Sequence, residues 1–309
     1  MQAAAFVLLC FIWGSSWIGI KYSLQGLPPF LGAGMRFGVA ILLLALFVLR
    51  RKGSLRLPRP FWWPVFVTGA LTYIFDYGLV YWGEQYLSAG VTAVLFATFP
   101  LFTSAMAIFV FRMEAFRGGA LFGMLLGLAG VAVIFSRDLL QARLEGLALL
   151  AGFGVVAGAA GGAFAIALTK QRLGSLDPAL LTFHQMIPGV VGLLTIGILS
   201  GESVEMPVPS VSWWAVLYLG AVASALAFSL YYWLLQSFHA STMSLVIYVT
   251  PVLALLLDWA SFGTRPSPAA ILGVLLIFSG IFLAEYPKYR RARQAKRLSS
   301  CSQEKQQTA

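Results

Sequence analysis

Charged residues are scarce in this chain. Asp, Glu, Lys and Arg make up 10% of its 309 residues, whereas 60% are hydrophobic and the mean hydropathy is +0.85. A water-soluble domain carries roughly 25% charged residues, so this composition excludes a soluble globule of the same size. Lipid-facing surface needs no charge. The scarcity of charge therefore indicates an integral membrane protein.

Cysteine and histidine are nearly absent as well, with two of each. Cys10 lies in the first apolar run and Cys301 near the end of the chain, so no disulfide framework follows. The sequence also lacks HExxH, GxSxG, a set of two carboxylates and a glycine-rich phosphate loop. We expect no catalytic residue, cofactor or metal. An intramembrane enzyme and a receptor-like or structural membrane module stay as alternatives to a transporter.

The net charge of +10 comes mostly from two basic clusters. One runs from Arg50 to Arg59 and the other from Lys288 to Lys305, and both flank apolar segments. Basic residues in this position set membrane topology and contact anionic lipids. We therefore expect a lipid bilayer, with anionic lipids at the basic loop and tail, and no nucleic acid among the partners.

Apolar segments recur along the whole sequence. About 20 residues of helix cross a hydrocarbon core of about 30 Å. Turn and charge signals such as Leu27-Pro28-Pro29 and Arg265-Pro266 separate the segments. The first segment has no Lys or Arg ahead of it, so we expect a span and not a cleaved signal peptide. The predicted spans are 3–20, 30–49, 62–82, 88–111, 118–135, 146–168, 178–199, 212–235, 241–262 and 268–286.

The basic residues divide unevenly between the two sides of these ten spans. With a cytoplasmic N-terminus, the inner segments hold 16 Lys and Arg and the outer segments hold 4, while Arg36 lies within a span. The excess predicts that both termini are cytoplasmic. The expected location is a bacterial inner membrane, crossed many times.

The two halves of the chain resemble each other at an offset of 149 to 151 residues. The matches are Lys21 with Lys170, Tyr81-Trp82 with Tyr232-Trp233, Gln85 with Gln236, Pro100 with Pro251, and Gly123-Met124-Leu125-Leu126 with Gly273-Val274-Leu275-Leu276. Each half has an odd number of spans, so the second copy must insert upside down. This pattern predicts two inverted five-helix repeats, at 1–140 and 141–286, with a substrate site between them. Residues 287–309 read as a basic, disordered cytoplasmic tail.

Several motifs resemble the EamA branch of the drug/metabolite transporter superfamily. They are Trp13-Gly14-Ser15-Ser16-Trp17, Lys21, Leu27-Pro28-Pro29, Met35-Arg36-Phe37, Tyr81-Trp82, Ser88-Ala89-Gly90, Phe99-Pro100-Leu101, Glu114 and Thr250-Pro251-Val252. The resemblance implies ten helices in inverted repeats and export of small metabolites such as amino acids. One departure stands out: Arg265 occupies the position that matches Glu114 and is often acidic in such proteins.

Two prolines lie midway along their spans at matching repeat positions, Pro100 and Pro251. A proline frees one backbone carbonyl, which in lipid must face protein or water. We expect bent helices that line a central cavity. The side chains beside the bends are Thr98, Phe99, Tyr248 and Thr250. The alternative is a packing kink whose carbonyl is satisfied by neighbouring helices.

Intramembrane polar residues supply the next candidates. Arg36 and Asp76 lie at similar depth, and such charges usually face the bundle interior in pairs. We expect them to interact or to face one vestibule; Asp258 and Glu84 are competing partners, and snorkelling to water is the alternative. Gln185 matches Arg36 in the second repeat. Its neighbour His184 either titrates near neutral pH or donates a buried hydrogen bond.

Aromatic residues complete the candidate path. Trp13 and Trp17 share one face of the first span and, with Ser15 and Ser16, form an amphipathic wall for an organic solute, or else pack the core. Tyr77 and Tyr232 are further candidates. Glycines four residues apart, as in 119–127 and 154–162, indicate close helix packing and are candidate faces of a possible homodimer. Because few charges lie inside the membrane, we expect a small solute of low net charge.

Overall fold

The computed structural model describes residues 1–143, 145–262 and 267–286. The predicted basic tail, Arg265 and the side chain of Asp258 lie outside the described part. Within it, eight helices are long and apolar enough to cross a membrane, and two shorter apolar helices, Gly118–Ile134 and Ala240–Leu253, complete the set. The expectation of an all-α membrane protein with ten spanning helices is confirmed.

The first repeat contains α1 (Gln2–Ser23), α2 (Pro29–Lys52), the short η1 (Arg59–Phe61), α3 (Trp62–Gly69), η2 (Ala70–Asp76), α4 (Tyr77–Gly83), α5 (Ala89–Phe96), α6 (Phe99–Ala105), η3 (Met106–Val110), α7 (Gly118–Ile134) and α8 (Ser136–Gln141). The third span is thus continuous from η1 to α4, and the fourth runs from α5 to η3. The segments η2 and η3 are π-helical.

The second repeat contains α9 (Leu147–Arg172), α10 (Pro178–Leu199), α11 (Ser210–Gly220), the π-helical η4 (Ala221–Leu226), α12 (Ala227–Ser237), α13 (Ala240–Ser244) and α14 (Val246–Phe262). A last helix, Pro268–Tyr286, closes the described chain. The third span of the second repeat runs from α11 to α12. Its π-helical segment η4 begins at residue 221, which is 151 residues after residue 70, where η2 begins in the third span of the first repeat.

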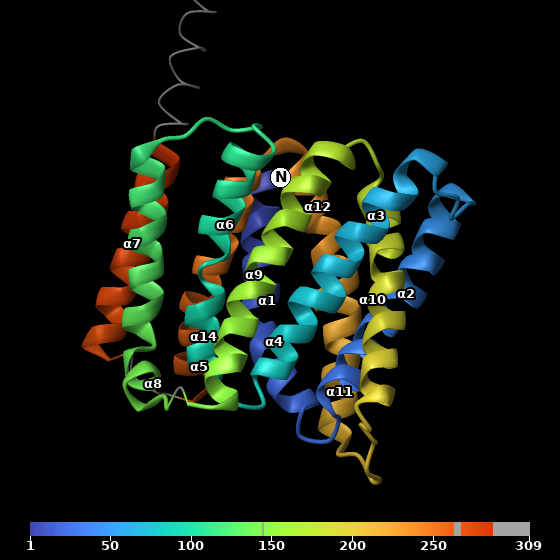
Figure 1. The fold of residues 1–309 in the computed structure, drawn as a ribbon, viewed down its shortest axis with the longest axis horizontal. Coiled ribbons are helices and arrows are strands. Elements are labelled where there is room, and N and C mark those ends of the chain that lie inside the picture. Colours follow the sequence, from blue (N-terminus) through green and yellow to red (C-terminus); the bar gives the residue numbers. More distant parts are fainter. Residues whose placement is uncertain (144, 263–266, 287–309) are drawn as a thin grey trace, which may run out of the picture.

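The helices stand side by side and alternate in direction (Figure 1). The N-terminus and the loops 53–58, 111–117 and 173–177 lie at one end of the bundle, which we call the amino-terminal face. The loops 24–28, 84–88 and 200–209 lie at the other end, the opposite face. The basic cluster from Arg50 to Arg59 therefore belongs to the amino-terminal face.

Prolines mark the same helix start in both repeats. Pro29 and Pro178 are the first residues of α2 and α10, where a missing N–H costs no helical hydrogen bond. The Asp177 side chain also caps α10 by accepting from Leu180 N (3.1 Å). Its other oxygen lies 3.2 Å from Arg51 and 3.2 Å from Lys52, so the end of α2 is tied to the start of α10.

The two repeats pack by exchanging helices. α2 packs along α10, α1 packs on α11 and α12, and α9 packs on η2 and α4. The first helix of each repeat thus contacts the third helix of the other. Gly158 and Gly162 permit this approach in α9, because a Cβ at Gly158 would lie 3.2 Å from the Asp76 carbonyl oxygen. The interface between the repeats therefore runs through the middle of the bundle.

Glycines also join α7 to the last helix. A Cβ at Gly130 would lie 2.7 Å from the Gly273 carbonyl oxygen, and one at Gly280 would lie 2.7 Å from Gly127 N. Such close contact between small residues is the usual way that membrane helices pack tightly. Most of the glycine face predicted on α7 is therefore used for packing inside the chain, whereas Gly119 has open space beside it.

Candidate functional site

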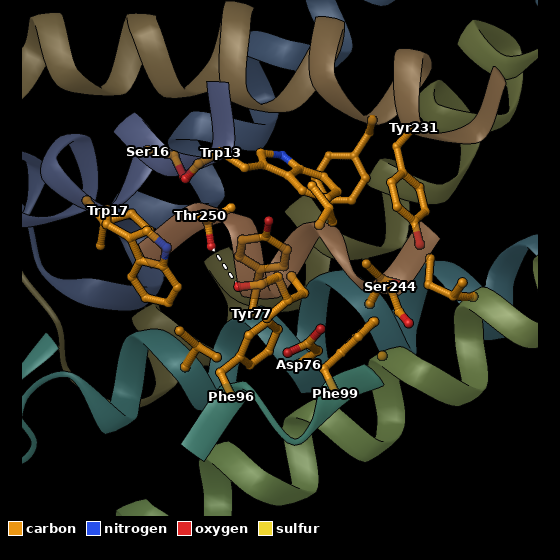
Figure 2. A pocket seen from close by; sticks show the side chains of 18 residues that line it. Trp13, Ser16, Trp17, Asp76, Tyr77, Phe96, Phe99, Tyr231, Ser244 and Thr250 are labelled. Carbon is orange, nitrogen blue, oxygen red and sulfur yellow. Dashed lines mark hydrogen bonds between the residues drawn. The ribbon is translucent and has the colours of Figure 1, made fainter. Parts of the chain in front are cut away.

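A central cavity lies between the two repeats (Figure 2). Its walls come from the first, third and fourth spans of each repeat: α1, η2, α4, α5 and α6 on one side, and α9, α12, α13 and α14 on the other. Of the residues expected on the path, seven line it: Trp13, Ser16, Trp17, Asp76, Tyr77, Phe99 and Thr250. The cavity thus lies between the two repeats, where the duplication predicts the substrate site.

The wall of this cavity is mostly aromatic. Trp13 packs on Phe228 and Tyr231, with ring centroids 5.4 Å and 5.2 Å apart, and Phe96 packs on Phe99 at 5.4 Å. The Trp13 indole donates to the carbonyl oxygen of Ala223 in η4 (3.3 Å). A π-helical turn interrupts the regular helical bonding, and this carbonyl is one acceptor within it. The rings are thus held by packing and by one backbone contact.

The polar groups in the wall present oxygen atoms to the cavity. Ser16 donates to Trp13 O (2.8 Å), Thr250 to Ile247 O (3.0 Å) and Ser244 to Ser241 O (2.8 Å). These hydroxyl hydrogens are therefore engaged by backbone. Asp76 is 4% exposed, and its Oδ1 has no hydrogen-bond partner among the described residues. Figure 2 shows the Asp76 carboxylate pointing between Tyr77 and Phe99.

The expected pair of Arg36 and Asp76 does not form. Arg36 is 1% exposed; its Nε donates to Ser224 Oγ (2.8 Å) and its NH1 to Tyr81 Oη (3.2 Å). Its guanidinium carbon lies 5.1 Å from the ring centroids of Phe37 and Tyr77. Hydroxyl partners and aromatic faces thus hold the cation outside the cavity. Within the described residues no ion pair joins Arg36 to Asp76, and Glu84, a competing partner, lies in a loop of the opposite face.

The prolines have unequal roles. The helix breaks at residues 97 and 98, and Pro100 follows in the first turn of α6, whereas Pro251 lies inside α14. Phe99 and Thr250 reach the cavity, but neither proline lines it. Thr98 donates to Leu95 O near the end of α5 (2.7 Å). Only one of the two expected side chains beside each proline, Phe99 or Thr250, therefore lines the cavity.

Three more expected residues point away from the cavity. Tyr248 donates to Met124 O (2.8 Å), and its ring packs against Gly127 of α7. The Ser15 hydroxyl forms a hydrogen bond with the Tyr218 hydroxyl. Tyr232 lines a separate small cavity near Lys170 and Gln236. Tyr248 and Ser15 therefore join helices to one another, and Tyr232 belongs to the amino-terminal end of the bundle.

Gln185 and His184 hold α10 to neighbouring segments. Gln185 Nε2 donates to the hydroxyls of Thr68 (2.7 Å) and Thr169 (3.2 Å). His184 Nε2 lies 2.8 Å from the carbonyl oxygen of Leu55 in the loop between α2 and η1. A carbonyl only accepts, so His184 carries its proton on Nε2. This is the geometry of the alternative in which the histidine donates a buried hydrogen bond.

A set of contacts that we call the latch joins helix ends at the amino-terminal face. Lys170 Nζ donates to the carbonyl oxygens of Leu235 (2.6 Å) and Gln236 (3.1 Å). Gln236 Nε2 donates in turn to Leu176 O (2.8 Å). These bonds draw the ends of α9 and α12 together. Nearby, Glu114 accepts from the backbone and the hydroxyl of Ser241, which links the two repeats.

The repeat equivalents of the latch are apart at the opposite face. Lys21 matches Lys170, Gln85 matches Gln236 and Leu27 matches Leu176. Lys21 and Gln85 are exposed, and neither side chain hydrogen-bonds with any residue in the described ranges. A cleft there is lined by Gln85, by the loop after α1 and by residues 203–209. One end of the bundle is therefore latched and the other is not.

The family model for EamA-like transporters matches residues 2–136 and again residues 149–286. The chain belongs to the EamA-like transporter family. It is therefore a membrane transporter. Membership in this family indicates that the protein transports a solute and does not catalyse a reaction. The two matches follow the two repeats; the repeat boundary at residue 140 stays a prediction.

Several similar proteins have the word transporter in their names. The "Uncharacterized transporter YoaV" of Bacillus subtilis is 27% identical and covers 91% of this chain and 95% of its own length. The "Uncharacterized inner membrane transporter YedA" of Escherichia coli K12 is 29% identical, with coverage of 92% and 90%. A solved crystal structure shares the fold, with a TM-score of 0.80, 20% identity, and coverage of 94% of this chain and 98% of that one.

The repeat offset relates most of the lining residues to one another. Twelve of the eighteen lining residues form repeat-related pairs: Trp13 with Gly162, Trp17 with Ile166, Tyr77 with Phe228, Val80 with Tyr231, Phe96 with Ile247, and Phe99 with Thr250. The offset applied to the predicted residues Trp13, Trp17 and Tyr77 reaches Gly162, Ile166 and Phe228. The other pairs that were missed, Val80 with Tyr231 and Phe96 with Ile247, have no predicted member from which the offset could start. The cavity is lined by the same positions of both repeats.

Proposed function

We propose that this chain exports a small metabolite of low net charge, such as an amino acid or a related solute, by alternating access between its inverted repeats. One observation supports this most directly. Repeat-related residues line a central cavity, while the latch is formed at one face only. Two copies of one fold that hold different conformations can exchange them, and that exchange would move the opening from one face to the other.

The exchange replaces the hydrogen bonds of the latch by their repeat equivalents at the opposite face. In the second state, Lys21 donates to the carbonyl oxygens of Glu84 and Gln85, which are the repeat equivalents of Leu235 and Gln236. The Gln85 amide donates to Leu27 O. Lys170 and Gln236 release their partners at the same time. The two states then contain the same number and kind of hydrogen bonds, so a small difference in free energy decides between them.

Charge supports an orientation of the protein in the membrane. The loops at the amino-terminal face carry the basic cluster from Arg50 to Arg59, together with Arg112, Arg117 and Arg172. Basic loops face the cytoplasm, and the basic segments are also where we expect anionic lipids. The amino-terminal face is then cytoplasmic in a bacterial inner membrane, and the described state is closed toward the cytoplasm. A homodimer stays a prediction.

A cavity-blocking variant tests transport. In Gly162→Leu the new side chain enters the cavity, because even a Cβ there would lie 3.0 Å from the Phe99 ring and overlap Asp76. We expect cells that produce this variant to lose export of a small-metabolite panel, measured as efflux from preloaded cells, by at least tenfold. Gly119→Leu is the matched control, because nothing lies within 4 Å of a Cβ at that position.

Both proteins must first elute as single species of wild-type size in detergent. Equal efflux from wild type and Gly162→Leu, with both proteins intact in the membrane, would show that the central cavity is not the transport path.

A further inference from the structure

We propose that the central cavity selects solutes that carry a protonated amine on an apolar body, and that Asp76 determines this specificity. The inference rests on the proposed transport function, because it concerns the solute that occupies the same cavity. Four features of the cavity support it: an unpaired carboxylate, the lack of a protein cation beside it, hydroxyl groups whose lone pairs face the cavity, and aromatic walls.

The first feature is the Asp76 carboxylate. It sits at the end of η2, lines the cavity and is 4% exposed. Gly162 of the facing helix leaves room for Oδ2, since a Cβ there would overlap it. Oδ1 has no hydrogen-bond partner among the described residues. An ionised carboxylate in such a place is costly unless a positive charge joins it.

The second feature is that the protein supplies no cation for Asp76 within its described part. The lining residues include no Lys, Arg or His. Arg36 is engaged by Ser224 and Tyr81 behind the aromatic wall, and Lys170 is engaged by carbonyl oxygens of the latch. The positive charge that neutralises Asp76 must therefore come from outside the protein, as a bound proton or as a cationic ligand.

The third feature is the direction of the hydroxyl groups. Ser16, Ser244 and Thr250 have given their hydrogens to backbone carbonyls, so they offer lone pairs to the cavity. The Trp13 N–H is likewise engaged by Ala223 O. An ammonium group has only donors, whereas a carboxylate has only acceptors. The Thr72 and Tyr231 hydroxyls also line the cavity and have no hydrogen-bond partner among the described residues, so they can donate or accept. Among the lining residues, the Asp76 carboxylate is therefore the group that favours an amine over an acid.

The fourth feature is the aromatic wall. Rings of Trp13, Trp17, Tyr77 and Phe99 surround the carboxylate or its approach (Figure 2). Aromatic faces attract cations and also bury an apolar body. The cavity volume is about 90 Å³, several times the roughly 10–15 Å³ that one water needs. This volume fits a small amine.

Binding of a matched series tests the inference. The probes are 2-phenylethylamine, 2-phenylethanol and 3-phenylpropionate, which share a ring and chain and differ in the charged group. Isothermal titration calorimetry on the full chain in lipid nanodiscs, with empty nanodiscs subtracted, gives each affinity. We expect wild type to bind the amine at least tenfold more tightly than the alcohol and to bind the acid weakest of the three.

In Asp76→Asn we expect the preference for the amine over the alcohol to fall to within about twofold, with alcohol binding retained. Retained alcohol binding shows that the variant is folded. Asp76→Glu should keep part of the preference, and Glu145→Gln, an exposed site, should keep all of it. An amine that binds no more tightly than the alcohol in wild type, or a preference unchanged in Asp76→Asn, would overturn the inference.

Flux separates this result from the proposed function. If the amine preference is absent but preloaded cells still export neutral solutes through wild type and not through Gly162→Leu, transport stands and the cation selectivity fails. If the amine binds as expected but no solute crosses the membrane, the selectivity stands and the proposed transport fails.

Discussion

Asp177 shows how one side chain can fasten two helices at the amino-terminal face. It caps α10 through Leu180 N and forms ion pairs with Arg51 and Lys52 at the end of α2. Burial alone would raise the pKa of Asp177, but the hydrogen bond from Leu180 N and the charges of Lys52 and Arg51 outweigh burial and lower this pKa below its usual value. The ionised form is therefore the one that the folded protein favours.

The lowered pKa of Asp177 predicts how the stability of the protein depends on pH. A carboxyl whose pKa is lower in the folded state adds stability above its unfolded pKa of about 3.9, and the addition is lost as pH falls through the folded pKa. Asp177→Asn keeps the helix cap but loses both ion pairs. Because Arg51 is 59% exposed, we expect a cost at pH 7 of about 1 kcal/mol or less.

The difference in thermal midpoint between wild type and Asp177→Asn, measured in detergent from pH 7 down to pH 3, should shrink below about pH 4. A difference that stays constant across this range would show that the charge of Asp177 does not stabilise the fold. Glu145→Gln, at an exposed position, is the matched control and should show no such trend.

Sequence reasoning at the residue scale succeeded where helical periodicity decides the outcome. Trp13 and Trp17 lie four residues apart, hence on one face, and both line the cavity with Ser16. It failed for Arg36 and Asp76, whose similar depth suggested a pair. Depth does not specify the direction in which a side chain points around a helix, and Ser224 with Tyr81 satisfies Arg36 elsewhere.

At the scale of elements, the predicted spans agree with the observed helices to within a few residues, because length and hydropathy set them. The fifth span, predicted at 118–135, is observed as Gly118–Ile134. The π-helical turns η2, η3 and η4 were not predicted. A π-helical turn depends on packing against neighbouring helices, and no proline or charge marks the sequence Ala70–Asp76 other than its final residue.

The contact of α7 with the last helix gives a test of packing. In Gly280→Leu the side chain meets the backbone of α7, because a Cβ alone would lie 2.7 Å from Gly127 N. Overpacking of this kind costs about 1–3 kcal/mol. We therefore expect a lower thermal midpoint in detergent for Gly280→Leu than for wild type.

Gly119→Leu makes the same replacement on α7 where a Cβ meets nothing within 4 Å, so it should keep or raise the midpoint, since leucine favours helix over glycine. If both variants unfold at the wild-type temperature, the close packing of these two helices is wrong.

At the scale of the whole molecule, the duplication relates the two walls of the cavity and the two ends of the bundle. The offset of 149 to 151 residues, read from the sequence, relates twelve of the eighteen lining residues and also relates the latch to its open counterpart. The sequence could not show which face is latched. Both states use the same residues and equivalent contacts, so a pattern of residue types does not distinguish them.

Reciprocal motion at the two faces is the most direct test of alternating access. Gln171 and Ser237 lie at the amino-terminal face, and Tyr22 and Tyr86 are their repeat equivalents at the opposite face. All four side chains are exposed. Each pair can carry two spin labels after Cys10 and Cys301, the only cysteines of the chain, are replaced by alanine. Double electron–electron resonance in nanodiscs then reports both distances.

Alternating access predicts two distances for each pair. A transported solute or an amine probe should shift the two pairs in opposite directions, so that Gln171–Ser237 lengthens as Tyr22–Tyr86 shortens. Two pairs that lengthen or shorten together, or that each keep a single distance while transport proceeds, would contradict the exchange of conformations between the repeats.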